Sequence, residues 1–433
     1  MGPSACQEKL VPWTFRMYAT PSGQAASQPT DLVPPLVPVW ELPKAATHGV
    51  DGVPVGGPKV AYVPVRQTDV VAIQGIDGDV VWHAHDIRTE YGFLRWTDRG
   101  IISDRCGCDR AYRSGGEGSD RLLISVADGA SRGFVGTDGI PVRRPDKDDA
   151  HWGHIPTWGK WMLSGTTAYD LDRACKVHFE GVVGGEMGVS ELYDGHAIGL
   201  YRGTSPDEEM VRCWDMRGEK VLWEANPRVI SRLQCMSGRV LLCWEALDRV
   251  VCRRLDTYEL LWQAPVLELP FEYKPGIISA TDPYMHTAVC DGSIYYDVPG
   301  TGERKLVCLD LATGQQRWQR TVPKYPLWEL DRKLVCPDIR GPHASLGMVW
   351  THEQVEGCSQ KEGSIVARSA VDGNIIWRSD PAESLLLRLI MDGCMVVQKG
   401  RDIQCWASGD PTGAAPKPKR IKLTRPKPQP KVF

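Results

Sequence analysis

Short apolar runs separated by glycine and aspartate turns are the dominant pattern along this chain. The stretch 305–318, KLVCLDLATGQQRW, shows it most clearly: Cys308 is followed by Asp310, a turn at 312–314 and a closing Trp318. Glycine at the turn supplies the positive φ that a short hairpin needs. The stretch therefore predicts a β-hairpin that ends in an aromatic residue.

The same hairpin recurs along the chain. Copies at 70–82, 211–223, 251–262 and 365–377 keep a small residue ten places before a tryptophan, although the third has Tyr258 where glycine is expected. Weaker copies at 122–134 and 167–179 end in phenylalanine. The closing positions are 39 to 59 residues apart, which is typical of four-stranded propeller blades. They are Trp82, Phe134, Phe179, Trp223, Trp262, Trp318 and Trp377, and we expect the tryptophans to be largely buried.

An eighth copy begins at 403–413 but has no closing tryptophan. The missing strand is found at 36–43, LVPVWELP, where Trp40 lies 42 residues before Trp82. We expect this N-terminal strand to complete the last blade and to remove free sheet edges. The sequence predicts an all-β fold with a single propeller over 34–413, of eight four-stranded blades, with seven as the alternative. An N-terminal extended arm (1–33) and a basic, Pro-rich disordered tail (414–433) flank it.

The pattern small-x-Asp-x-x-x-Gly-x-x-x-Trp, clearest in 308–318, resembles the tryptophan-docking repeat of the quinoprotein (PQQ-like) β-propeller superfamily over residues 36–413. That superfamily includes pyrroloquinoline-quinone alcohol dehydrogenases and non-catalytic propellers such as the outer-membrane assembly lipoprotein. The resemblance implies the fold and not an activity. The dehydrogenases use a vicinal Cys-Cys disulfide and a calcium ion, whereas the nearest approach here is Cys106-Gly107-Cys108. We therefore expect the non-catalytic branch, with no cofactor.

Several side chains are of the types that zinc prefers, and whether they bind a metal is left open. They are Cys106, Cys108, His83, His85, His151 and His154. Free thiols and satisfied histidines are the favoured interpretation, with His83 and His85 on one face of a strand. Four other cysteines recur at one position of the repeat and are expected to be core residues: Cys213, Cys252, Cys308 and Cys405.

Charge is distributed unevenly over the 433 residues. Seven of the 51 Lys and Arg lie between 417 and 431, where there is no acid, so the rest of the chain carries a net charge of −10. No export signal is seen and no window approaches 18 apolar residues. With 14 scattered cysteines, a reducing, cytoplasmic compartment is the expectation, without membrane attachment.

Both terminal segments are candidates for partner binding. The tail offers Lys417, Lys419, Arg420, Lys422, Arg425, Lys427 and Lys431, and the N-terminal arm offers Trp13 and Phe15. We expect a non-catalytic scaffold or adaptor that binds proteins within a larger assembly, with nucleic acid as a further partner through the tail. The alternatives are a PQQ- or metal-dependent oxidoreductase, or a propeller that binds a small ligand at its central channel.

Overall fold

The computed structural model describes residues 32–45, 54–57, 59–65, 69–85, 87, 93–97, 99–104, 122–133, 157–164, 167–177, 186–193, 195–202, 210–215, 220–226, 230–236, 240–245, 249–265, 287–299, 303–323, 343–345, 347–354, 362–383, 385–410 and 417–423. These residues form sheets, antiparallel except for one parallel pair, and no helix, so the predicted all-β fold is confirmed. They divide into two compact units.

One unit contains four sheets from the middle of the chain. The first has β10 (Thr157–Trp158), β11 (Trp161–Ser164), β12 (Thr167–Asp170) and β13 (Cys175–Val177). The second has β14 (Glu186–Tyr193), β15 (His196–Arg202), β16 (Met210–Asp215) and β17 (Lys220–Ala225). The third has β18 (Ile230–Met236), β19 (Val240–Glu245), β20 (Arg249–Arg254) and β21 (Leu260–Pro265). The fourth has β22 (Thr287–Cys290), β23 (Ser293–Pro299), β24 (Glu303–Asp310) and β25 (Gln316–Pro323).

The other unit contains four sheets from the two ends of the chain. The first has β2 (Val55–Gly56), β3 (Val60–Val65), β4 (Asp69–Gln74) and β5 (Val80–Ala84), and the second has β6 (Phe93–Thr97), β7 (Gly100–Asp104), β8 (Leu122–Ile124) and β9 (Ser131–Gly133). The third has β26 (His343–Ser345), β27 (Met348–Gln354), β28 (Glu362–Ser369) and β29 (Ile375–Arg378), with β30 (Ala382–Glu383) paired to β28. The fourth has β31 (Leu385–Met391), β32 (Cys394–Lys399), β33 (Asp402–Ser408), β1 (Leu36–Leu42) and β34 (Lys419–Arg420). Apart from β1, β30 and β34, consecutive strands of a sheet pair in chain order, which is the meander of a propeller blade.

Each repeat copy places its small residue opposite its tryptophan. Ala72 pairs with Trp82, Cys213 with Trp223, Cys252 with Trp262, Cys308 with Trp318 and Ala367 with Trp377. A β-bulge follows the small residue in all five pairs, so one residue of the outer strand is left unpaired just before the tryptophan. A small residue is needed because the large indole occupies the space across the ladder.

The indole N–H of the closing tryptophan donates to a backbone carbonyl in the hairpin of the following sheet. This bond joins Trp40 to Gly75, Trp82 to Val126 (2.9 Å), Trp223 to Leu255 (2.7 Å) and Trp262 to Leu311 (2.8 Å). Three residues after each acceptor, a residue with positive φ packs on the indole: Gly78, Gly129, Tyr258 and Gly314. The glycine of the motif is therefore required both for the turn and for close contact with the preceding sheet.

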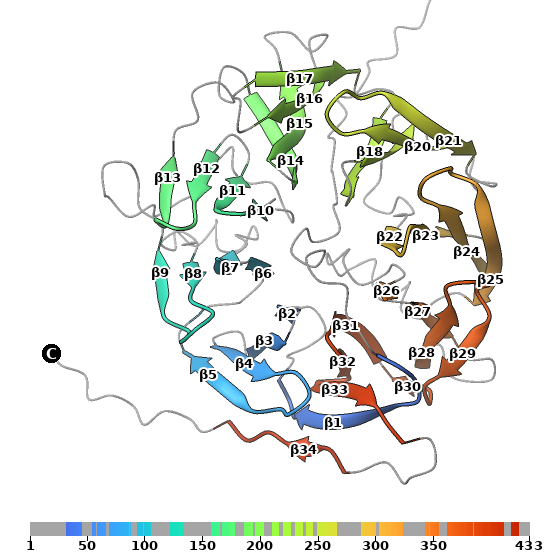
Figure 1. Ribbon diagram of the computed structural model, residues 1–433. Coiled ribbons are helices and arrows are strands. Elements are labelled where there is room, and N and C mark those ends of the chain that lie inside the picture. Colours follow the sequence, from blue (N-terminus) through green and yellow to red (C-terminus); the bar gives the residue numbers. More distant parts are fainter. Residues whose placement is uncertain are drawn as a thin grey trace, which may run out of the picture. The chain divides into compact units, whose positions relative to one another are not determined.

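The N-terminal strand completes the last sheet (Figure 1). β1 pairs antiparallel with β33, and Trp40 lies opposite Cys405, as the other tryptophans lie opposite their small residues. Trp40 is fully buried, in a cluster with Leu42, Val396 and Cys405. Leu32, four residues before β1, is also buried.

The expected disorder of the whole tail is wrong for residues 417–423. β34 pairs in parallel with β1, and the amide of Ile421 donates to the carbonyl of Glu41 at 2.8 Å. The side chain of Ile421 is buried in the core cluster of this sheet. The stretch 419–425 contains no proline, so its amides are available for pairing, which a count of prolines over the whole tail does not reveal.

Trp377 is only partly buried, contrary to the expectation, whereas Trp82, Trp223, Trp262 and Trp318 are buried. Its ring contacts Trp350 and Trp406 at centroid distances of 6.4 and 6.3 Å. In the sheet after Trp377, β33 and β1 come from opposite ends of the chain and no hairpin connects them. Among the described residues, Trp377 therefore has no hairpin carbonyl that corresponds to the acceptors of the other indole N–H groups. Phe134 and Phe179 lie outside the described residues.

Candidate protein-interaction surface

Three outer strands expose apolar side chains immediately before their closing tryptophans. We call these residues the edge pairs: Val80 and Val81 on β5, Leu260 and Leu261 on β21, and Ile375 and Ile376 on β29. Their exposed fractions run from 41 to 53%. On β17 the corresponding Val221 is 37% exposed. Because exposed apolar residues on sheet edges favour association with other chains, these positions are candidates for protein contact.

The local geometry explains why both members of a pair are exposed. The tryptophan faces the core, and the residue just before it is the unpaired one at the bulge. The bulge twists the edge away from regular strand pairing, which opposes unspecific sheet extension. Fully burying one such Val, Leu or Ile side chain against a partner is worth about 1.5–3 kcal/mol.

The outer strand β25 differs from the others, since its pair is Gln316 and Arg317. The Arg317 guanidinium binds the carboxylate of Asp310 and donates to the hydroxyl of Ser293. This position provides a polar counterpart for experiments on the apolar edge pairs.

The β1 edge already carries an additional strand, β34 from the tail (Figure 1). Lys419 donates to the carbonyl of Asp77 at 3.0 Å and forms an ion pair with Asp79, both in the hairpin between β4 and β5. Arg420 lies 4.0 Å from the carboxylate of Glu41. The segment is therefore attached to two neighbouring sheets of one unit.

Four of the predicted partner-binding residues are exposed on this segment: Lys417, Lys419, Arg420 and Lys422. Burial of Ile421 and partial burial of Leu423 orient the segment, so Arg420 and Lys422 on the other face point outward. Arg425, Lys427, Lys431, Trp13 and Phe15 lie outside the described residues.

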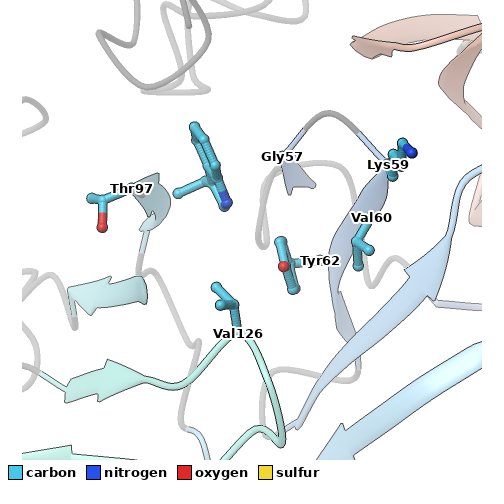
Figure 2. Close-up of a pocket in the computed structure, with 7 residues that line it drawn as sticks. Gly57, Lys59, Val60, Tyr62, Thr97 and Val126 are labelled. Atoms are coloured by element: carbon cyan, nitrogen blue, oxygen red, sulfur yellow. The ribbon is translucent and has the colours of Figure 1, made fainter. Parts of the chain in front are cut away.

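A small apolar pocket lies between the β2–β5 and β6–β9 sheets, and its volume is about 370 Å³. Figure 2 shows Tyr62 and Val126 facing this space, with Thr97 and Val60 on opposite sides of it. The Thr97 hydroxyl is engaged in its own turn, where it donates to the carbonyl of Gly100. Burial raises the pKa of Tyr62, so its phenol stays neutral at ordinary pH. The pocket thus offers an apolar hollow rather than a set of reactive groups.

The repeat cysteines are packing residues. Cys213, Cys252, Cys308 and Cys405 are all free thiols with no exposed surface. Burial raises the pKa of Cys213 to about 12 and that of Cys252 to about 11, so these thiols are not nucleophilic at neutral pH. Cys106, Cys108, His151 and His154 lie outside the described residues, whereas His83 and His85 do lie on one face, beside Asp69.

Sequence reasoning missed the edge pairs and the docked tail strand. A signal for the former was present, because two apolar residues precede the closing tryptophan in VVW, LLW and IIW. The outer position of the strand and its bulge cannot be recognised without the pairing. For β34 the corresponding signal was the alternation of the apolar Ile421 and Leu423 with basic residues.

Among the described residues, no helix is long and apolar enough to cross a membrane. No protein-family model matches the chain, and no curated protein matches it. Solved structures do resemble it. A quinohemoprotein alcohol dehydrogenase from Comamonas testosteroni is 11% identical with a TM-score of 0.53, over 95% of this chain and 81% of that one.

A europium-containing methanol dehydrogenase is likewise 11% identical with a TM-score of 0.53, over 89% of this chain and 95% of that one. The computationally designed Ika8 protein is 11% identical with a TM-score of 0.52, over 86% of this chain and 99% of that one. At this identity the likeness shows the fold alone. The expected quinoprotein-like propeller arrangement is confirmed at the level of the fold. The fold by itself does not indicate an activity.

Proposed function

We propose that this protein is a non-catalytic β-propeller that acts as a scaffold or adaptor within a larger protein assembly. The observation that carries the proposal is the recurrence of exposed apolar edge pairs on β5, β21 and β29. Side chains of this kind at sheet edges are usually avoided or covered, and interfaces have apolar centres of this composition. The docked β34 supports the proposal, because it demonstrates that an outer edge of this chain accepts a further strand.

We also infer that the eight sheets are eight blades of one ring, closed by β1. The support is the meander of four consecutive strands in seven sheets, and the completion of the eighth by β1, whose Trp40 pairs with Cys405 from the other end of the chain. An electron cryomicroscopy map of the protein would count the blades. A ring of six or seven would overturn this inference.

The proposed partners are proteins with an apolar strand or an acidic surface, the latter for the exposed lysines and arginine of 417–422. The proposed compartment is the reducing cytoplasm, in keeping with the free buried thiols of the described repeat copies. Nucleic acid is the second partner class that the basic segment could attract, and salt dependence of binding would distinguish it.

The test is isolation of the tagged full-length protein from its own cells, followed by measurement of partner stoichiometry. Double substitutions at the edge pairs, such as Leu260→Lys with Leu261→Glu, should release a stoichiometric partner that binds that edge. The matched control is Gln316→Lys with Arg317→Glu on β25, where the pair is already polar.

Retention of every stoichiometric partner by variants of all three edge pairs would overturn the proposal. So would recovery of the protein with stoichiometric quinone and quinone-dependent alcohol oxidation, which would establish the oxidoreductase alternative. A stoichiometric small molecule bound in place of protein partners would establish the ligand-binding alternative.

A further inference from the structure

Three side chains with metal-binding atoms converge on one face of the β4–β5 pair. Asp69 is the first residue of β4, His83 lies on β5, and His85 follows β5 directly. The Oδ2 atom of Asp69 lies 3.0 Å from Nε2 of His83 and 3.2 Å from Nδ1 of His85. The three ligand atoms all lie within 4.8 Å of one another, and the two imidazole centroids are 3.9 Å apart.

The strand register produces this convergence. His83 and His85 are two residues apart, so they share one face of the strand. His83 lies opposite Val71 and Ala84 opposite Val70, so the next position along the ladder brings His85 beside Asp69. The donor atoms are therefore fixed by a paired hairpin rather than by a loose loop.

The donor set and its spacing fit a divalent transition metal. The two imidazoles are borderline ligands, and a set of two imidazoles with one carboxylate suits Zn²⁺ better than Ca²⁺ or Mg²⁺, which prefer all-oxygen ligand sets. Tetrahedral zinc ligands at about 2.0–2.2 Å from the ion lie about 3.4 Å from one another. The observed 3.0 and 3.2 Å separations need only a small expansion to admit an ion.

The site is neither sealed nor fully open. The side chains of His83, Asp69 and His85 are 15, 20 and 31% exposed. Ions can therefore enter from solvent, and a fourth coordination position remains for water or for a partner's side chain.

We propose that Asp69, His83 and His85 form a binding site for a divalent transition metal ion of the zinc class. This inference does not depend on the scaffold proposal. The competing account is a hydrogen-bonded cluster in which both imidazoles donate to Asp69 and no ion is bound. The two accounts differ in whether metal binds stoichiometrically and in which residues hold it.

The experiment uses the full-length chain freed of metal with a chelator and then titrated with Co²⁺ as a spectroscopic probe. We expect one equivalent to give the visible absorption of tetrahedral nitrogen and oxygen ligation, and Zn²⁺ to displace it. His83→Asn and His85→Asn should each weaken binding at least tenfold. Asp77→Asn is the matched control and should leave binding unchanged, because Asp77 is exposed on the same hairpin and contacts Lys419 through its backbone carbonyl.

A second measurement distinguishes lost ligands from lost folding. Zn²⁺ should raise the melting temperature of the wild-type chain by mass action and should not raise that of His85→Asn, the more exposed of the two histidine variants. Cys106→Ser with Cys108→Ser should leave Co²⁺ binding intact. Absence of Co²⁺ binding, binding indifferent to both histidine substitutions, or binding lost only in the cysteine variant would each overturn the proposal.

Discussion

The phenol ring of Tyr258 stacks on the indole of Trp223, with centroids 4.4 Å apart and the planes inclined by 26°. Gly78, Gly129, Gly314 and Gly373 occupy this position in four other described hairpins, and Tyr258 adopts the same positive φ, 59°. The Arg253 guanidinium lies 4.3 Å from the centroid of the phenol ring, on which it makes a cation–π contact. At four tryptophans the repeat therefore maintains a contact with the next hairpin, made by backbone at a glycine and by a stacked ring at Tyr258.

Gly314→Ala should destabilise the chain more than Gly292→Ala does. Both glycines have positive φ, 70° and 64°, so both variants carry the same backbone strain. A Cβ at Gly314 would overlap the ring of Trp262, whereas none of the described atoms lies within 4 Å of a Cβ at Gly292. We expect an additional cost of about 1–3 kcal/mol from this overpacking, measured by urea unfolding. Equal stabilities would contradict the docking contact.

Trp262→Phe should destabilise the folded chain more than Trp377→Phe does. The first removes a 2.8 Å hydrogen bond and leaves the carbonyl of Leu311 without its indole donor. Because this bond is only partly buried, its loss should cost about 0.5–1.5 kcal/mol. Trp377 is only partly buried and contacts the rings of Trp350 and Trp406, which phenylalanine can partly replace. Thermal unfolding followed by circular dichroism would rank the two variants, and the reverse order would refute the role assigned to the indole N–H.

Truncation after residue 413 should lower the melting temperature, whereas truncation after Leu423 should leave it nearly unchanged. The first removes Ile421 from the core cluster and exposes the β1 edge. Ile421→Ala in the full chain should reproduce much of the loss, since deleting a buried isoleucine costs about 2–5 kcal/mol. Identical melting temperatures for both truncations would mean that β34 does not dock in solution.

The hairpin repeat could be predicted from the sequence because every part of it has a local cause. The Asp of the motif is an example: Asp310 Oδ1 accepts bonds from the amides of Ala312 and Thr313 and so fixes the turn. Ser369 does the same at its own turn, accepting from the amides of Val371 and Asp372. The residue type is replaceable because the hydrogen bond, rather than the carboxylate, is what the turn needs.

Features that depend on long-range strand pairing could not be predicted from the local sequence. The cluster of Asp69, His83 and His85 needs the register between two strands, and only the shared face of the histidines follows from their spacing. The docking of Ile421 needs knowledge of the free β1 edge, which exists only after the two ends of the chain have paired. The local composition of 417–423 favours disorder, but burial of Ile421 stabilises the paired strand.

Asp310→Asn should lower stability at neutral pH, and the difference from the wild type should vanish toward pH 2. Hydrogen bonds from the Arg317 guanidinium and from Thr313 lower the pKa of Asp310 to about 2, against about 3.9 in an unfolded chain. A carboxylate with a depressed pKa stabilises the fold fully above the unfolded value, and this contribution is lost as pH falls from about 4 through about 2. Melting temperatures of both proteins from pH 7 to pH 2 would test this. Glu259→Gln, which breaks the exposed pair with Arg254, is the control and should have little effect at any pH. A stability difference for Asp310→Asn that stays constant down to pH 2 would show that Arg317 does not stabilise the carboxylate.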